Sequence, residues 1–371
     1  MRLQLTVAIG AMCAMVASPA RTAETTADAR VNLYADQELT VVNQSSVASV
    51  ETADGLRANG HFGVDVISGA TRSFLPDAIT SATRINETRL EGGVAVGGIP
   101  LPGVRLDAGY LTSKEPDYWS HRASLTAVTE LFERRGTLSV TGSLGLSSVG
   151  RAGDPSYSEE EGRGGVEASY AHVLGRATSL TALVSVEQSV CGERAGCDAS
   201  PYRYVPVAIH DSGLFLALPE RHPSSRTGGA IAARLSQSIV PGLALHGGYR
   251  LYTDSWGVIG HTTDAVVAQS FFGDRLGVRL DMRAYLQGPA SFHDDYVLKG
   301  GAAPALRTAD RRLGPTHDVT AGGSGSLDLP ALGPVRLRMQ LRLAHSWFRY
   351  VDAVIPARDA WIAGLGVGAT F

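Results

Sequence analysis

Two segments of this chain alternate regularly between apolar and charged side chains, and this pattern limits its possible folds more than any other feature. In residues 276–287, apolar side chains such as Leu280 alternate with charged ones such as Arg283, and residues 333–347 repeat the pattern. Because the side chains of a strand alternate between its faces, each segment has one apolar and one basic face. An arginine that faces hydrocarbon at the bilayer midplane costs about 2–4 kcal/mol. We therefore expect the apolar rows to face lipid and the arginines to face a shared interior.

Similar runs of about 10–13 residues recur from residue 57 onward, separated in turn by short and by longer polar connections. This spacing predicts an all-β fold, a single antiparallel transmembrane β-barrel of about 14 strands (range about 12–16), with short periplasmic turns and long extracellular loops. We expect a hairpin over 203–218 to project from the outer rim, and connections 113–119 and 254–261 to be outer loops. The predicted strands are 57–68, 86–97, 102–112, 120–132, 136–148, 163–173, 177–188, 226–238, 242–253, 262–272, 276–287, 316–328, 333–347 and 360–371.

The final stretch, Ala360–Phe371, fits the closing strand of such a barrel. Every second residue back from Phe371 is apolar as far as Trp361, and the other face is mostly small. A terminal Phe on such a strand resembles the C-terminal signature of bacterial outer-membrane barrels, whereas the alternative is an ordinary closing strand of a soluble sandwich. The resemblance implies two partners: outer-membrane lipid, and the barrel-assembly machinery through the strand that ends at Phe371.

The beginning of the chain predicts export. Residues 1–20 have a basic start, an apolar run and small residues at the end, as in a cleaved signal peptide, which favours the outer membrane of a Gram-negative bacterium. Residues 21–56 are polar, and we expect a periplasmic or lumenal segment there, followed by the barrel over 57–371. The net charge of −3 does not suggest a nucleic-acid partner.

Two cysteines remain after the predicted signal peptide, Cys191 and Cys197. Because exported proteins meet an oxidising environment, we expect a local disulfide between them. A metal or redox pair is the alternative, but two thiols supply only half of a zinc site. We expect no metal and no cofactor.

The predicted inner face carries a set of arginines: Arg250, Arg279, Arg283, Arg336, Arg338 and Arg342. One hypothesis is a basic lumen wall that attracts anions, as charged rings do in pores. The other is an internal network of ion pairs that packs a closed lumen, since Asp281 lies on one of these strands and Asp318 and Asp328 lie on strand 316–328, between the two richest ones. The sequence favours neither.

Residues 249–262 read YRLYTDSWGVIGHT, and residues 283–287 contain Arg-x-Tyr-x-Gln. Together these pieces resemble domain-of-unknown-function family 3570, bacterial exported proteins regarded as outer-membrane barrels. The resemblance implies a barrel and no settled activity. It leaves two roles for the shared residues near the mouth: an inner-wall site, or bracing of the outer loops. The shared residues are Tyr249, Arg250, Tyr252, Asp254, Trp256, His261, Arg283, Tyr285 and Gln287.

These observations favour passage or binding of a small solute, with anions as one candidate class. The alternative is a plugged structural or assembly barrel whose outer loops, including the Cys191–Cys197 loop and residues 288–315, bind a partner. An outer-membrane lipid hydrolase is the weakest hypothesis. His345 and Ser346 are adjacent and point to opposite faces of a strand, so they cannot form a nucleophile–base pair. We expect no enzyme.

Overall fold

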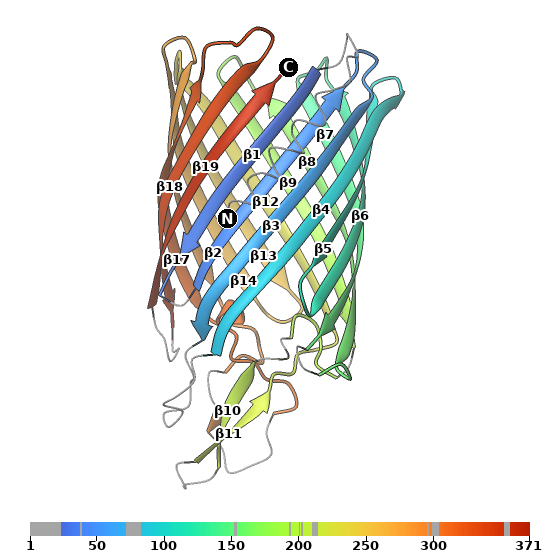
Figure 1. Ribbon diagram of the computed structural model, residues 1–371, viewed down its shortest axis with the longest axis vertical. Coiled ribbons are helices and arrows are strands. Elements are labelled where there is room, and N and C mark those ends of the chain that lie inside the picture. The colour runs from blue at the N-terminus through green and yellow to red at the C-terminus, as the bar shows by residue number, and fades with distance from the viewer. Residues whose placement is uncertain are drawn as a thin grey trace.

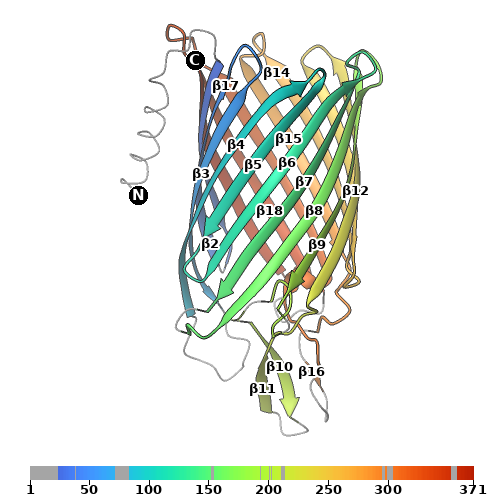
Figure 2. The same cartoon turned by 90° about the vertical axis from the view of Figure 1, so that its right-hand side faces the viewer.

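The computed structural model describes residues 24–371 except 38, 72–82, 152–153, 193, 200, 202, 210–213, 295–296, 299–303 and 352–356. Over these residues, sixteen antiparallel strands form one closed barrel (Figure 1 and Figure 2). The barrel strands are β1 (Glu24–Ala35), β2 (Leu39–Glu51), β3 (Arg57–Thr71), β4 (Thr83–Leu101), β5 (Val104–Lys114), β6 (Tyr118–Leu131), β7 (Gly136–Gly150), β8 (Ser158–Val173), β9 (Thr178–Cys191), β12 (Ser225–Val240), β13 (Leu243–Asp254), β14 (Ile259–Phe271), β15 (Leu276–Gln287), β17 (Thr316–Asp328), β18 (Arg336–Tyr350) and β19 (Ala357–Thr370).

The barrel closes between its first and last strands, where β1 lies antiparallel to β19 with Thr26 opposite Thr370 and Leu33 opposite Ala363. β2 joins β1 to β3. These strands occupy most of residues 21–56, so the predicted periplasmic or lumenal segment is wrong. Its alternation is faint because the outer face of β1 is mostly alanine and valine. The backbone pairing with both neighbours compensates for this weak apolar pattern.

The predicted barrel is confirmed, and β1 and β2 raise the strand count from about 14 to sixteen. The expected outer loops 113–119 and 254–261 shrink to 115–117 and 255–258, because the flanking strands continue beyond their predicted ends. Residues 1–20, the predicted signal peptide, lie outside the described residues.

The outer wall is apolar, as the alternation predicts. Leu280 and Leu341 are 60% and 63% exposed although they lie within β15 and β18. Trp119, Trp347 and Trp361 are exposed near strand ends. A closed barrel leaves no unpaired edge in lipid, and an exposed apolar band with aromatic borders matches a hydrocarbon layer. The protein is an outer-membrane β-barrel.

The two ends of the barrel differ. Tight turns close one end, where the C-terminus and the start of β1 lie (Figure 1). In one of these turns Phe272, Gly273 and Asp274 all have positive φ, of 54°, 64° and 68°. By the usual arrangement of such barrels, this end is periplasmic and the opposite end, with longer connections, is extracellular.

Two extracellular loops contain secondary structure of their own. β10 (Tyr204–Ile209), β11 (Leu214–Pro219) and β16 (Val297–Leu298) form a separate sheet that projects beyond the rim (Figure 1). β10 and β11 confirm the hairpin predicted over 203–218. Residues Arg311–Leu313 form the short 3-10 helix η2. Among the described residues, no helix has the length and hydropathy that a membrane span requires.

Candidate functional site

All six predicted lumen arginines lie on the inner face of the wall. Arg279 and Arg283 alternate with the lipid-facing Leu280 along β15. Arg342 pairs in register with Ser324, which also lies opposite Arg279. The inner face therefore carries the basic side chains on β13, β15 and β18: Arg250, Arg279, Arg283, Arg336, Arg338 and Arg342.

Two of these six arginines are neutralised by aspartates. Arg342 donates two hydrogen bonds to Asp281, at 3.0 and 2.9 Å. Arg338 likewise pairs with Asp328, with a hydrogen bond of 2.7 Å between Nη2 and Oδ2. Some of these arginines therefore belong to an internal network of ion pairs, and others remain, among the described residues, as unpaired positive charges on the wall.

Ion pairs on this wall reach across an intervening strand where that strand presents glycine. Arg234 on β12 lies 2.8 Å from Asp264 on β14, with Gly248 of β13 between them. A Cβ at Gly248 would lie 2.5 Å from Asp264 Oδ1. Arg57 and Asp107 interact in the same way across β4 at Gly97, at 3.3 Å. Because Gly248 and Gly97 have no side chain, residues on the strands at either side can form an ion pair over them.

Five arginines lie at a similar depth in the lumen. Each is the seventh or eighth residue of its strand, counted from the periplasmic end. We call this set the arginine belt. It comprises Arg30 on β1, Arg234 on β12, Arg250 on β13, Arg283 on β15 and Arg342 on β18.

Three members of the belt form no ion pair or hydrogen bond within the described part of the chain: Arg30, Arg250 and Arg283. Arg250 instead lies over the ring of Tyr252, with 5.5 Å between the guanidinium carbon and the ring centroid. Sequence reasoning missed Arg30, because β1 was not recognised as a strand. It also missed Arg234, although alternation within 226–238 places this residue inward.

The family-motif residue Asp254 organises the extracellular end of β13. Its side chain is fully buried and accepts hydrogen bonds from Arg226, from the Tyr252 hydroxyl and from the backbone N–H groups of Trp256 and Val258. These contacts hold the start of β12, the end of β13 and the following turn together.

Trp256 packs in a small core at the mouth, where it is only 2% exposed. Its indole N–H donates to the Ser225 carbonyl at 2.9 Å, and the Arg226 guanidinium lies over its ring. His222 and Phe292 contact the same ring. The residues of this core come from two extracellular loops and the β13–β14 turn, so Trp256 connects these three segments.

The expected disulfide between Cys191 and Cys197 is present and joins the end of β9 to the same small core. Gln287 connects the second loop to the wall, because its amide donates to the carbonyls of Arg312 and Gly314. The Tyr285 hydroxyl in turn donates to Gln287.

Two motif residues do not face the lumen. Tyr249 and His261 lie on the outer wall, where the Tyr249 hydroxyl and His261 Nδ1 are 2.7 Å apart. His261 is opposite Leu251 and the exposed Leu286, which fixes its face. Of the two roles left open for the motif, an inner-wall site therefore excludes these two residues, because strand alternation turns them toward lipid.

His345 and Ser346 take opposite faces of β18, as alternation requires. Ser346 is buried on the inner wall, within 2.7 Å of the Thr320 hydroxyl. His345 lies on the outer wall between the rings of Trp347 and Trp361. This geometry separates the two groups that a hydrolase would have to bring together.

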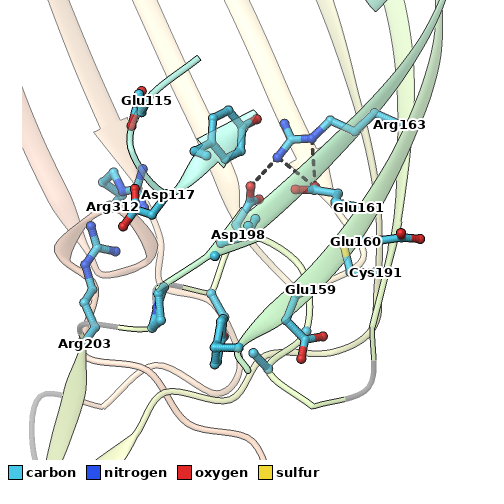
Figure 3. A pocket seen from close by; sticks show the side chains of 18 of the residues that line it. Glu115, Asp117, Glu159, Glu160, Glu161, Arg163, Cys191, Asp198, Arg203 and Arg312 are labelled. Carbon is cyan, nitrogen blue, oxygen red and sulfur yellow. Dashed lines mark hydrogen bonds and ion pairs between the residues drawn. The ribbon is translucent and has the colours of Figure 1, made fainter. Parts of the chain in front are cut away.

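An open cavity of about 390 Å³ lies at the extracellular mouth, on the β4–β9 side (Figure 3). Arg163 extends into it and pairs with Glu161 and Asp198. Burial raises the pKa of Glu115, against the attraction of Arg89. Burial would also raise the pKa of Asp198, but its neighbouring arginines lower it. The charged lining is Glu87, Glu115, Asp117, Glu159, Glu160, Glu161, Asp198, Arg163, Arg203 and Arg312.

Comparison with known proteins gives one family. Residues 182–341 match Protein of unknown function (DUF3570). The matched segment contains the motif at 249–262 and the Arg283–Gln287 motif, so the resemblance seen in the sequence is confirmed there. No curated protein matches the chain.

Several solved Pseudomonas aeruginosa structures are similar in fold. OccK1 (OpdK) has 11% identity and a TM-score of 0.46, covering 94% of this chain and 99% of its own. OprD has 10% identity and a TM-score of 0.47, covering 94% and 95%. The siderophore receptor PirA has 9% identity and a TM-score of 0.45, covering 94% and 80%.

Proposed function

We propose that this barrel is a passive channel for small solutes, with a preference for anions. Barrels of 16–18 strands are wide enough to leave an aqueous channel. Residues 24–51 support this proposal because they belong to the wall. The observation that carries the anion preference is the arginine belt, in which Arg30, Arg250 and Arg283 have no carboxylate partner among the described residues.

The carboxylates of the mouth do not cancel this preference. They lie on the β4–β9 side, whereas the belt lies on the arc from β12 to β1. Two of them are occupied, since Glu161 and Asp198 pair with Arg163. An anion that follows the β12–β1 side meets unpaired guanidinium groups, and charged rings of this kind select ions in pores.

Planar-bilayer recording tests the proposal. The wild-type protein is expected to conduct, with a reversal potential in a KCl gradient that reports chloride preference. Arg250→Glu/Arg283→Glu is expected to shift that potential toward potassium. Arg134→Glu makes the same type of charge change in a periplasmic turn and is expected to leave the potential unchanged. A wild-type protein that does not conduct would refute the channel.

A second candidate function is binding of a partner protein at the cell surface. The observation that favours it is the sheet of β10, β11 and β16, which stands beyond the rim and outside the barrel (Figure 2). Deletion of the β10–β11 hairpin separates the two functions, since partner binding requires it and conduction does not.

A further inference from the structure

We infer that Arg250 and Arg283 form a binding station for an oxyanion, which would take a small solute that carries a carboxylate or phosphate group. This inference rests on the proposed channel and adds a solute class to it. It also gives separate roles to the family-motif residues: Asp254, Trp256 and Gln287 fasten the mouth, whereas the two arginines remain available to a ligand.

The two arginines approach the same region from strands on either side of β14. Arg250 lies opposite Thr262, which lies opposite Tyr285, two residues along β15 from Arg283. Arg250, Thr262, Tyr285 and Arg283 therefore lie together on the inner face of three neighbouring strands. The backbones of β13 and β15 are about 10 Å apart, since neighbouring strands are separated by about 4.8 Å. Long arginine side chains from both strands can therefore contact one small anion.

Within the described part of the chain, no carboxylate forms an ion pair with either arginine. Asp264 lies opposite Arg283, but it pairs with Arg234 across Gly248. Asp254, the aspartate at the end of β13, forms an ion pair with Arg226. A guanidinium offers parallel N–H donors that match the two oxygens of a carboxylate or phosphate. Two such groups that form no ion pair among the described residues favour an oxyanion over chloride.

Asp318 is the group that competes with this ligand. It lies opposite Tyr285 on β17, two residues from Thr320, which lies opposite Arg283, and the two charged groups form no ion pair. Its Oδ1 atom is buried and has no hydrogen-bond partner among the residues that the structure describes. Removing this negative charge should therefore strengthen oxyanion binding at Arg283.

Isothermal titration calorimetry of the folded, detergent-solubilised protein with inorganic phosphate, and separately with succinate, tests the station. We expect saturable binding of at least one of them. Arg250→Gln and Arg283→Gln are each expected to weaken it about tenfold, as loss of a charge-assisted hydrogen bond does. Asp318→Asn is expected to strengthen it. Arg336→Gln removes an unpaired inner-wall arginine at the periplasmic end of β18 and should leave the affinity unchanged.

Heat-modified gel mobility verifies that each variant is folded. The inference is overturned if the wild type binds neither anion, or if Arg336→Gln weakens binding as much as the substitutions at Arg250 and Arg283. Conductance of the same preparations separates the two proposals. A protein that conducts chloride preferentially but binds neither phosphate nor succinate would refute the binding station and leave the channel proposal standing. A protein that binds phosphate or succinate but does not conduct would refute the channel proposal.

Discussion

The Arg234 guanidinium lies 2.8 Å from the Asp264 carboxylate although a whole strand separates the two residues. The side chains meet over Gly248, which offers no Cβ to obstruct them. This pairing removes Asp264 from the immediate competition for Arg283 and so maintains an unpaired arginine in the belt.

Gly248→Ala is expected to displace Asp264 and disrupt its contact with Arg234, because the new Cβ would lie 2.5 Å from Asp264 Oδ1. Anion preference in planar bilayers should then decrease, since Asp264 becomes free to neutralise Arg283. The free energy of unfolding in urea should change by less than about 1 kcal/mol, as for other solvent-accessible ion pairs. Gly247→Ala is the control, because nothing lies within 4 Å of its Cβ position. Equal effects of the two substitutions would contradict the proposed role of Gly248.

Trp256→Ala is expected to loosen the mouth and leave the barrel closed. Loss of a buried tryptophan lowers the free energy of unfolding by about 3–5 kcal/mol. Here the destabilised part is the pair of loops that pack on Trp256. Limited proteolysis should cut within 192–224 or 288–315 much faster than in the wild type, while heat-modified gel mobility is retained. Trp119→Ala removes an exposed tryptophan and should not accelerate cleavage. Unchanged cleavage of Trp256→Ala would show that the loops are held by other contacts.

Cys191→Ser/Cys197→Ser is expected to destabilise the segment that the disulfide closes. A closed loop of this length contributes about 2 kcal/mol through the entropy of the unfolded segment. Trypsin should then cleave near Arg194 more rapidly, as it should in wild-type protein treated with a reductant. If reductant accelerates cleavage equally in the double variant, the effect does not come from this bond.

Acidification is expected to loosen the loop of residues 288–315. Burial lowers the pKa of His293, although Asp310 and Asp294 act in the opposite direction. The unfolded loop therefore binds a proton at higher pH than the folded loop does. The contribution of neutral His293 to the stability of the loop is fully present above the ordinary histidine pKa of about 6.5. It decreases as the pH falls below that pKa. Proteolysis between pH 7.5 and 5 measures this decrease.

Asp310 does not contribute in that pH window. Burial raises the pKa of Asp310, but Arg203 and Arg312 outweigh this effect and lower it, so its stabilising charge is lost only at more acidic pH. His293→Gln should therefore remove most of the dependence between pH 7.5 and 5. His317→Gln, at an exposed histidine, should retain it. A pH dependence that survives in His293→Gln would assign it to another group.

Deletion of residues 24–51 is expected to prevent formation of a stable barrel. Without β1 and β2, the edges of β3 and β19 lose their partners, and unpaired backbone groups are costly in lipid. The deletion variant should show no heat-modifiable form on gels. Deletion of residues 204–219 removes a hairpin that lies outside the barrel, and it should still fold. A folded barrel without residues 24–51 would contradict the closure seen here.

The sequence alone determined the barrel and the direction of its side chains. Residues 276–287 and 333–347 alternate so regularly that only one register keeps Arg283 and Arg342 out of lipid, and this local pattern requires no tertiary information. The same alternation turns Tyr249 outward, onto the apolar row of its strand, and Arg250 inward.

Only the tertiary structure decided which charges meet. Asp264 pairs across Gly248 with Arg234, on a strand that is not its neighbour, and Asp281 reaches Arg342 across β17. β1 and β2 also became visible only through closure, since their apolar pattern is weak and their pairing partner β19 lies at the far end of the chain. Alternation along a strand is a local property, whereas ion pairing and closure depend on which strands the fold brings side by side.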